Sequence, residues 1–249
     1  MNLADRLIVS LQSPIEQVRQ FAPSLRGFIS TFLLEEYDSE MFEYLRNDLG
    51  FHVMVNTKLI GDPEKINEEI DKMLLNSPKM ITVLARTGQA SMKILRQRLI
   101  DTTPVAIIDT PVASNGAGQF PSSVCRVITN QAALAKQSGI QSLMCSPKIF
   151  RVLRSTKDFN DCQFFITGIW PSWVVLPTDP ENTMSVQGAI KERVKYLIID
   201  EQVFNQGSLK AEILKVLKRM DNVLKKVAEK DTATFDKEDI ASYKQGQSV

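Results

Sequence analysis

The sequence predicts an α/β protein of the (β/α)8-barrel class, folded as a single domain. It has 249 residues, of which 43% are hydrophobic, and its 30 Lys and Arg nearly balance its 29 Asp and Glu. A chain of this length buries enough apolar surface to need neither disulfide nor metal. Short apolar runs alternate with amphipathic stretches, and about eight such units in ~250 residues suit a barrel better than an open doubly wound sheet.

The apolar runs are too short for helices and are rich in Val, Ile and Leu, so we expect them to be strands. Their apolar residues are consecutive rather than alternate, which is typical of strands covered on both faces in a parallel sheet. In chain order the predicted strands are Leu7–Leu11, Phe28–Ser30, Phe51–Val55, Met80–Leu84, Val105–Asp109, Ser142–Cys145, Gln163–Ile166 and Tyr196–Ile199.

Stretches with apolar residues three and four positions apart predict the helices between these strands. They are Ser39–Asn47, Pro63–Leu75, Ala90–Ile100 and Val124–Ser138. A last helix is expected from Ser208, an N-cap candidate, to about Val227. We therefore assign residues 1–227 to the barrel and residues 228–249 to a polar C-terminal tail, which is either solvated or a docking peptide.

The composition excludes several classes of function. A net charge of +1 gives no long-range field to attract a polyanion, so no nucleic-acid partner is expected. No run approaches the ~18 apolar residues of a membrane span, and the spacing of the three cysteines suits neither a disulfide framework nor a zinc ribbon. We expect a soluble, cytoplasmic protein. The single histidine, His52, excludes a multi-histidine metal site, and neither cofactor nor metal is predicted.

Two further segments predict loops. Asn115–Gln119 contains glycines, but no Gly-Lys-Ser/Thr follows, so we expect a loop after the fifth strand rather than a phosphate loop. The acidic run Glu35–Asp38 is expected to be a solvated turn before a helix.

The end of the third predicted strand carries a resemblance to a known family. It contains Asn56, Lys58 and Gly61-Asp62-Pro63, at the strand end where barrels place their chemistry. This segment resembles the Asp-x-Lys-x-x-Asp-Ile-Pro motif of the orotidine 5′-phosphate decarboxylases, in which the lysine delivers the proton. Lys58 falls on that lysine. Asn56 and Gly61 stand at the two carboxylate positions, and Asp62 lies one residue late.

The resemblance extends from Arg6 to about Asn205. Its best-preserved piece is Ala132–Gly139 followed by Met144–Pro147, which is similar to the family's Ala-Lys-x-x-Gly helix end and Val-Cys-Ser-Pro strand. Elsewhere the resemblance implies changed site residues: Gln12 in place of an aspartate, Ser30 in place of a lysine, and Leu84 in place of a histidine.

The family's phosphate site is also altered. Gly168–Pro171 resembles the Gly-Ile-Arg-Pro turn, with Trp170 in place of the arginine, and Asp200 and Glu201 replace a Gly-Arg pair. Glycine permits close backbone approach to a phosphate, and Glu201 reverses the arginine's charge. We therefore expect no phosphate binding, and no nucleotide ligand.

Together these substitutions predict a catalytically inactive, decarboxylase-like barrel. Its expected role is a structural or adaptor subunit of a larger protein complex, such as a bacterial secretion system, with other protein subunits as partners. Trp170 and Trp173 are candidate partner-binding residues, although their apolar loop is equally suited to folding over the barrel mouth. The alternative is a divergent orotidine 5′-phosphate decarboxylase, a carboxy-lyase of pyrimidine nucleotide biosynthesis, that uses Lys58 and Asp62.

Overall fold

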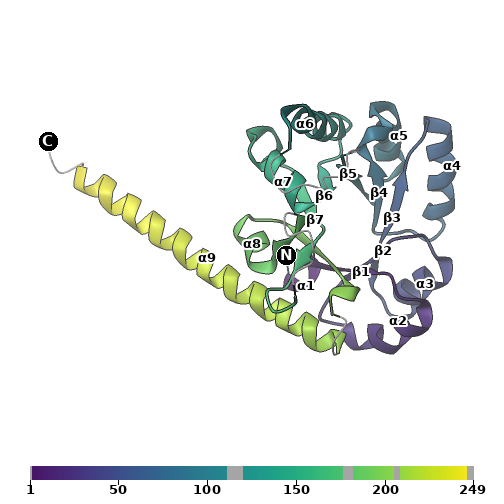
Figure 1. The fold of residues 1–249 in the computed structure, drawn as a ribbon, viewed down its shortest axis with the longest axis horizontal. Coiled ribbons are helices and arrows are strands. Elements are labelled where there is room, and N and C mark those ends of the chain that lie inside the picture. Colours follow the sequence, from purple (N-terminus) through teal and green to yellow (C-terminus); the bar gives the residue numbers. More distant parts are fainter. Residues whose placement is uncertain (1, 111–119, 176–181, 205–207, 246–249) are drawn as a thin grey trace.

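The computed structural model describes residues 2–110, 120–175, 182–204 and 208–245, with side chains described as far as Glu229. Within these residues, eight parallel strands close into a barrel in the order β1-β10-β7-β6-β5-β4-β3-β2. Helices surround the barrel, and the last of them leaves it (Figure 1). The predicted single-domain (β/α)8 barrel is confirmed.

The barrel strands are β1 (Leu7–Leu11), β2 (Thr31–Leu34), β3 (His52–Leu59), β4 (Met80–Leu84), β5 (Thr103–Ile107), β6 (Ser142–Cys145), β7 (Gln163–Ile166) and β10 (Tyr196–Asp200). A separate parallel pair is formed by β8 (Ile169–Trp170) and β9 (Met184–Ser185).

The α-helices are α1 (Leu3–Arg6), α2 (Ile15–Phe21), α3 (Ser39–Glu43), α4 (Pro63–Leu74), α5 (Gln89–Arg98), α6 (Ser122–Gln137), α7 (Pro147–Arg154), α8 (Val186–Lys191) and α9 (Leu209–Gln245). Short 3-10 or π turns are η1 (Ala22–Leu25), η2 (Tyr44–Asp48), η3 (Ala85–Thr87), η4 (Lys157–Phe159) and η6 (Glu201–Phe204). The four helices predicted between strands begin and end within two residues of α3 with η2, α4, α5 and α6.

One side chain from each barrel strand fills the centre of the barrel. These eight residues form a hydrophobic cluster separate from the layer between strands and helices: Ile8, Leu33, Met54, Met80, Val105, Met144, Phe165 and Ile198. Phe165 stacks on Tyr196 below this layer, with ring centroids 4.1 Å apart. The closed barrel therefore has a solid apolar interior, and polar groups are left to its ends.

The second strand lies later in the chain than predicted. The prediction of Phe28–Ser30 is wrong, because Gly27 makes a turn with a φ of 83° and β2 begins only at Thr31. Thr31–Leu34 is fully buried and pairs with both β1 and β3. Ser30 therefore precedes the strand. Its amide donates to the carbonyl of Ala4, at the end of the barrel where the strands begin.

The last helix continues beyond its predicted end. It spans 37 residues, so it is ~55 Å long and ends at Gln245 instead of near Val227. Its first half buries Ile213, Val216, Met220 and Val223 on the barrel, whereas Figure 1 shows its C-terminal half projecting away. The segment predicted to be a polar tail is therefore largely helical.

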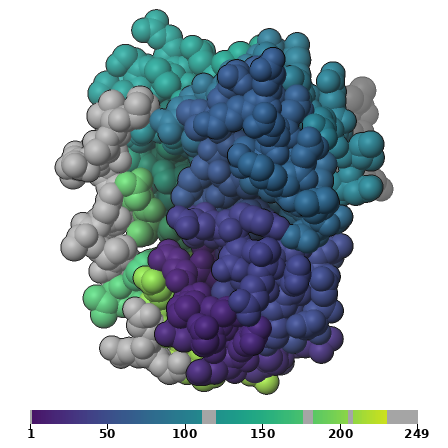
Figure 2. Space-filling view, turned by 90° about the vertical axis from the view of Figure 1, so that its right-hand side faces the viewer, coloured from purple at the N-terminus to yellow at the C-terminus, as the bar shows by residue number. Residues whose placement is uncertain are grey.

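Further observations concern a predicted loop, membrane spans and one face of the molecule. The predicted loop Asn115–Gln119 lies outside the described residues. Among the residues that are described, no helix is long and apolar enough to cross a membrane. Figure 2 shows the face turned away from the projecting half of α9, which consists mostly of N-terminal segments, coloured purple to blue.

The packing of the barrel interior can be tested by truncating its largest side chain, Phe165. Phe165 is 1% exposed, so Phe165→Ala should lower the free energy of unfolding by about 3–5 kcal/mol, measured by urea denaturation. Leu75→Ala is the control, because Leu75 is 84% exposed and its truncation should change stability by less than about 0.5 kcal/mol. Equal effects of the two substitutions would contradict a packed interior.

Candidate functional site

A layer of polar side chains lies directly above the apolar interior, at the carboxyl ends of the strands. Successive inward-facing residues of a strand are two positions apart. Ile8 is thus followed by Ser10, Leu33 by Glu35, Met54 by Asn56, Met80 by Thr82, and Ile198 by Asp200. This end of a barrel is where catalytic groups are found, so these residues form the candidate site, which we call the mouth.

Glu35 is the centre of the mouth. Its carboxylate accepts hydrogen bonds from Ser10 Oγ at 2.9 Å and from Asn56 Nδ2 at 2.7 Å. Lys58 Nζ lies 3.5 Å from the same carboxylate, with 57% of the lysine side chain and 33% of the glutamate side chain exposed. The expectation of a solvated turn is therefore wrong for Glu35, although Asp38 does cap α3 at the surface.

A bulge in β3 places Asn56 and Lys58. The pairing of β3 with β4 shifts between Val55 and Leu59, and Lys58 has a φ of 46°. The fully buried Thr82 holds this bulge. Its hydroxyl donates to Asn56 Oδ1 at 2.9 Å and accepts from the Lys58 amide at 3.3 Å. The lysine therefore reaches the mouth through a local distortion that Thr82 stabilises.

Asp62 does not join Lys58 in the mouth. It is exposed and serves as the N-cap of α4, where its carboxylate accepts the amide of Lys65 at 2.9 Å. Gly61 precedes it with a φ of 149° and is held by Thr87 Oγ1, which donates to its carbonyl at 2.9 Å. Of the three residues predicted as remnants of the catalytic motif, the structure brings together Asn56 and Lys58.

Asp200 and Glu201 line the side of the mouth between β10 and β1. Asp200 accepts from Gln12 Nε2 at 2.5 Å and from the Gln202 amide at 2.9 Å. Partial burial raises the pKa of the Asp200 carboxyl, and the nearby charges of Glu201 and Glu35 raise it further.

Glu201 is turned into the protein. It is 7% exposed, and its Oε1 accepts the backbone amides of Gln12, at 2.8 Å, and of Ser13. Its Oε2 is buried with no hydrogen-bond partner in the structure. A carboxylate thus occupies the backbone donors that follow β1 and links β1 to β10.

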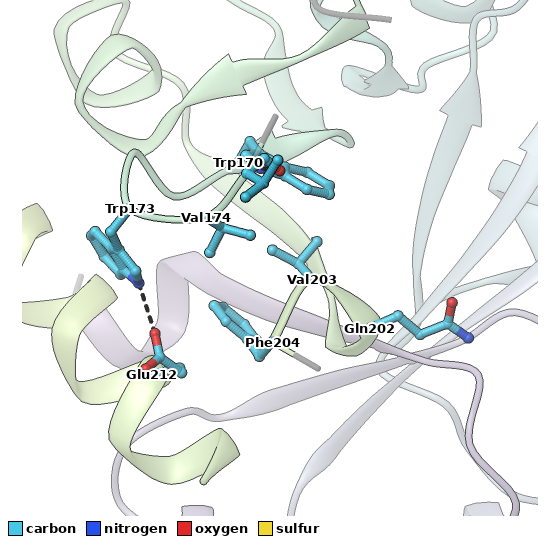
Figure 3. A pocket seen from close by; sticks show the side chains of 8 residues that line it. Trp170, Trp173, Val174, Gln202, Val203, Phe204 and Glu212 are labelled. Atoms are coloured by element: carbon cyan, nitrogen blue, oxygen red, sulfur yellow. Dashed lines mark hydrogen bonds between the residues drawn. The ribbon is translucent and has the colours of Figure 1, made fainter. Parts of the chain in front are cut away.

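The two tryptophans lie beside the mouth, Trp170 at the end of β8 and Trp173 on the loop that follows it. Trp170 is half-buried and donates from Nε1 to the carbonyl of Val175 at 2.9 Å. Trp173 is 40% exposed and donates to Glu212 of α9 at 2.7 Å (Figure 3). The Lys215 ammonium and this indole hydrogen bond lower the pKa of Glu212. A cavity of about 430 Å³ lies between this loop, η6 and α9.

The described part of the mouth has no cluster of metal-ligating side chains. No group of three or more His, Cys, Asp or Glu that could hold a metal ion occurs among the described residues. The described charges are those of Glu35, Asp200 and Glu201 against Lys58, with a further pair, Arg86 and Asp109, 3.5 Å apart beyond β4 and β5. The mouth therefore carries an excess of carboxylates.

Comparison with known proteins gives the ancestry of this barrel. No family profile matches the chain. The orotidine 5′-phosphate decarboxylase of Nautilia profundicola is 20% identical over 234 residues, which cover 88% of this chain and all of that protein. The chain is a distant homologue of the orotidine 5′-phosphate decarboxylases.

Two solved structures share the fold. The orotidine 5′-monophosphate decarboxylase of Metallosphaera sedula aligns with a TM-score of 0.64 and 14% identity, over 88% of this chain and 99% of that one. An uncharacterized conserved protein from Geobacillus kaustophilus aligns with a TM-score of 0.63 and 15% identity, over 87% of this chain and 99% of the other. The similarity to decarboxylases thus spans the whole barrel.

Sequence reasoning missed Glu35, Ser10 and Thr82. The sequence predicts the second strand too early, which aligns Ser30 with the decarboxylase lysine and leaves Glu35 in a predicted turn. The available signal was the repeated pattern of an apolar residue followed two positions later by a polar one, as in Leu33 and Glu35 or Met80 and Thr82. In a barrel that pattern marks the level at which the interior becomes polar.

The hydroxyl of Thr82 can be tested for its role in the bulge. Thr82→Val keeps the side-chain shape but leaves Asn56 and the Lys58 amide without a partner, so unfolding free energy should fall by about 1–3 kcal/mol. Thr82→Ser retains the hydroxyl and should recover most of this loss in the same denaturation measurement. A Val variant as stable as the Ser variant would remove the hydroxyl from the explanation.

The raised pKa of Asp200 predicts a pH dependence of stability. Between the unfolded pKa of about 3.9 and the higher folded pKa, the native state binds more protons, so stability falls as pH rises through this window. Asp200→Asn should therefore raise the melting temperature at neutral pH, and the gain should disappear below about pH 3.9.

Asp161→Asn gives the control of opposite sign. The hydrogen bond from Lys136 lowers the pKa of Asp161, so this substitution should lower the melting temperature at neutral pH. A loss of stability in Asp200→Asn at neutral pH would contradict the electrostatic account of the mouth.

Proposed function

We propose that this chain is a non-catalytic barrel of decarboxylase ancestry that works through contacts with other proteins and does not bind orotidylate. One observation carries the proposal. Glu201, at the position that resembles the decarboxylase phosphate arginine, places its carboxylate on the amides of Gln12 and Ser13. A nucleotide phosphate beside it would meet like charges at a few ångströms, which costs several kcal/mol in a partly dry site.

The pairing of the mouth residues supports the same proposal. Glu35 is already bonded to Ser10, Asn56 and Lys58, and Asp200 is bonded to Gln12 and Gln202. A ligand that bonded to Glu35 or Asp200 would have to replace these bonds. Carboxylates that are already bonded to other groups of the protein suit a structural role for the mouth.

Trp173 and Val175 supply an exposed apolar rim beside this closed mouth. Val175 is 88% exposed and Trp173 is 40% exposed. Partly exposed tryptophans are enriched at the centres of protein interfaces. We propose this loop, including Trp170, as a protein-contact surface.

A divergent carboxy-lyase is the second candidate. Two observations favour it: the homology covers the full length of the Nautilia profundicola decarboxylase, and Lys58 still lies beside a carboxylate in the mouth. In this candidate Lys58 is the proton donor and Glu35, rather than Asp62, is the carboxylate beside the reacting group. Its substrate would be orotidylate.

An orotidylate assay separates the two candidates. Turnover is followed by ultraviolet absorbance, with the Nautilia profundicola decarboxylase assayed in parallel, and uridylate binding is followed by thermal shift. We expect no turnover and no shift, whereas a ligand at roughly ten times its Kd would stabilise the protein by ~1.4 kcal/mol. Turnover that Lys58→Ala abolishes, while melting temperature is kept, would establish the lyase and overturn the proposal.

The proposed protein contact is tested by a separate experiment. Affinity capture from the native organism should yield a partner in near-stoichiometric amount, and Trp173→Ala should reduce its recovery by about tenfold or more. Leu75→Ala, on the exposed surface of the barrel away from this loop, is the matched control. Absence of any stoichiometric partner contradicts the subunit role, and full recovery with Trp173→Ala removes the loop from the contact.

A further inference from the structure

A pocket opens at the end of the barrel where the strands begin, between the turns that precede β2 and β3. Its volume is about 270 Å³. Arg26 and Gly27 line it from the first turn, and Gly50 and His52 line it from the second. The two glycines have φ values of 83° and 75°, and a Cβ added at either would meet no atom within 4 Å. A small ligand can therefore approach the backbone of both turns.

The charged side chains around this pocket are mostly cationic. Arg26 is exposed on the wall of the pocket. Lys79, directly before β4, and Arg46, in η2, act electrostatically on His52 from two further elements. Among the side chains that the structure describes, Arg26, Arg46 and Lys79 form no ion pair. Asp5 of α1 is the carboxylate that acts on His52, and its effect is weaker than those of Lys79 and Arg46.

His52 responds to this concentration of positive charge. It is the single histidine of the chain and is exposed in the pocket. Partial burial lowers the pKa of its imidazole, and the positive charges of Lys79 and Arg46 lower it further. Like charges disfavour the imidazolium, so an anion placed among these groups would favour it.

The size of the pocket and the geometry of its donors restrict the ligand. Pockets that enclose drug-sized ligands usually measure about 300–1,000 Å³, so this pocket suits a compact ion better than a nucleotide. A guanidinium offers a planar fork of N–H donors that matches two oxygens of an oxyanion. Cations that converge from separate turns match a tetrahedral dianion, whose oxygens accept from several directions.

We propose that this pocket binds a compact oxyanion with two negative charges, of the size of phosphate or sulfate. Arg26 is its principal donor, and His52 becomes a second, charged donor when the anion binds. Lys79 and Arg46 contribute through their positive charge. The pocket lies at the end of the barrel opposite the mouth, so this inference does not depend on whether the mouth is catalytic.

The single histidine provides a direct test, because an untagged chain has one imidazole signal. The signal is followed by proton–carbon NMR from about pH 5 to pH 8, in sodium sulfate and in sodium chloride of equal ionic strength. Sulfate is the probe because it keeps both negative charges throughout this range. We expect a saturable response with a Kd on the order of 1 mM, and a raised pKa of His52 in sulfate.

The pH dependence of binding follows by linkage. An anion that raises the pKa of His52 must bind more tightly when the imidazole is charged, so sulfate affinity should be about threefold or more higher at pH 5.5 than at pH 8. A response that does not saturate, that chloride reproduces, or that strengthens as pH rises overturns the proposal. Sulfate stabilises folded proteins in general, so a thermal shift would not serve as the readout.

Two arginine substitutions locate the site. Arg26→Ala should weaken sulfate binding by about tenfold, because it removes the guanidinium donors while leaving His52 as the reporter. Arg126→Ala is the matched control and should leave the affinity unchanged, since Arg126 is exposed on α6 and has no ion pair among the described side chains. Both variants should keep their melting temperature in chloride. Unchanged affinity in Arg26→Ala, or an equal loss in Arg126→Ala, overturns the proposal.

Competition tests the charge of the ligand. Inorganic phosphate at pH 8 should displace sulfate, and acetate, a monoanion, should do so about tenfold less well at equal ionic strength. Equal competition by the two anions contradicts the selection of a dianion.

Discussion

The alternation of side chains along eight closed strands is the constraint on which the rest of this structure depends. Once Ile8, Leu33, Met54 and their counterparts fill the interior, the residues two positions later must form the next layer. In this chain that layer consists of Ser10, Glu35, Asn56, Thr82 and Asp200. The mouth is thus polar because of strand register. Ser10, Glu35, Asn56 and Thr82 bond to one another, whereas Asp200 bonds to Gln12 and Gln202. No ligand is needed to satisfy the described side chains of Glu35 and Asp200.

Glu201 shows how a barrel can accommodate a largely buried carboxylate. Burial of a carboxylate is costly unless it is hydrogen-bonded, and here two backbone amides donate to one of its oxygens, Oε1. The same bonds join the first and last barrel strands at the mouth, so Glu201 contributes to closing the barrel. Replacement of Glu201 by arginine would therefore remove these structural bonds as well as change the charge.

Much of this architecture follows from local sequence pattern, and the rest depends on pairing between distant segments. Buried strands such as Met80–Leu84 and Ser142–Cys145 are marked by their own apolar runs, and the barrel class follows from their number. The start of β2 is not marked locally, since Phe28-Ile29 is as apolar as Phe32-Leu33, and only pairing with β1 and β3 selects Thr31–Leu34. Because β2 begins later than predicted, Glu35 follows its last residue and lies in the mouth. The bulge at Lys58 likewise depends on Thr82, on the neighbouring strand.

The extent of α9 raises the same question of local against distant stabilisation. Up to Val223 the helix is fixed by apolar contacts with the barrel, and the Trp173–Glu212 hydrogen bond ties its start to the loop after β8. Beyond Val227 the sequence contains no such run of core residues, which is why composition alone suggested a tail. A helix propagates readily once nucleated, so the barrel-bound half supplies the nucleus that the projecting half lacks.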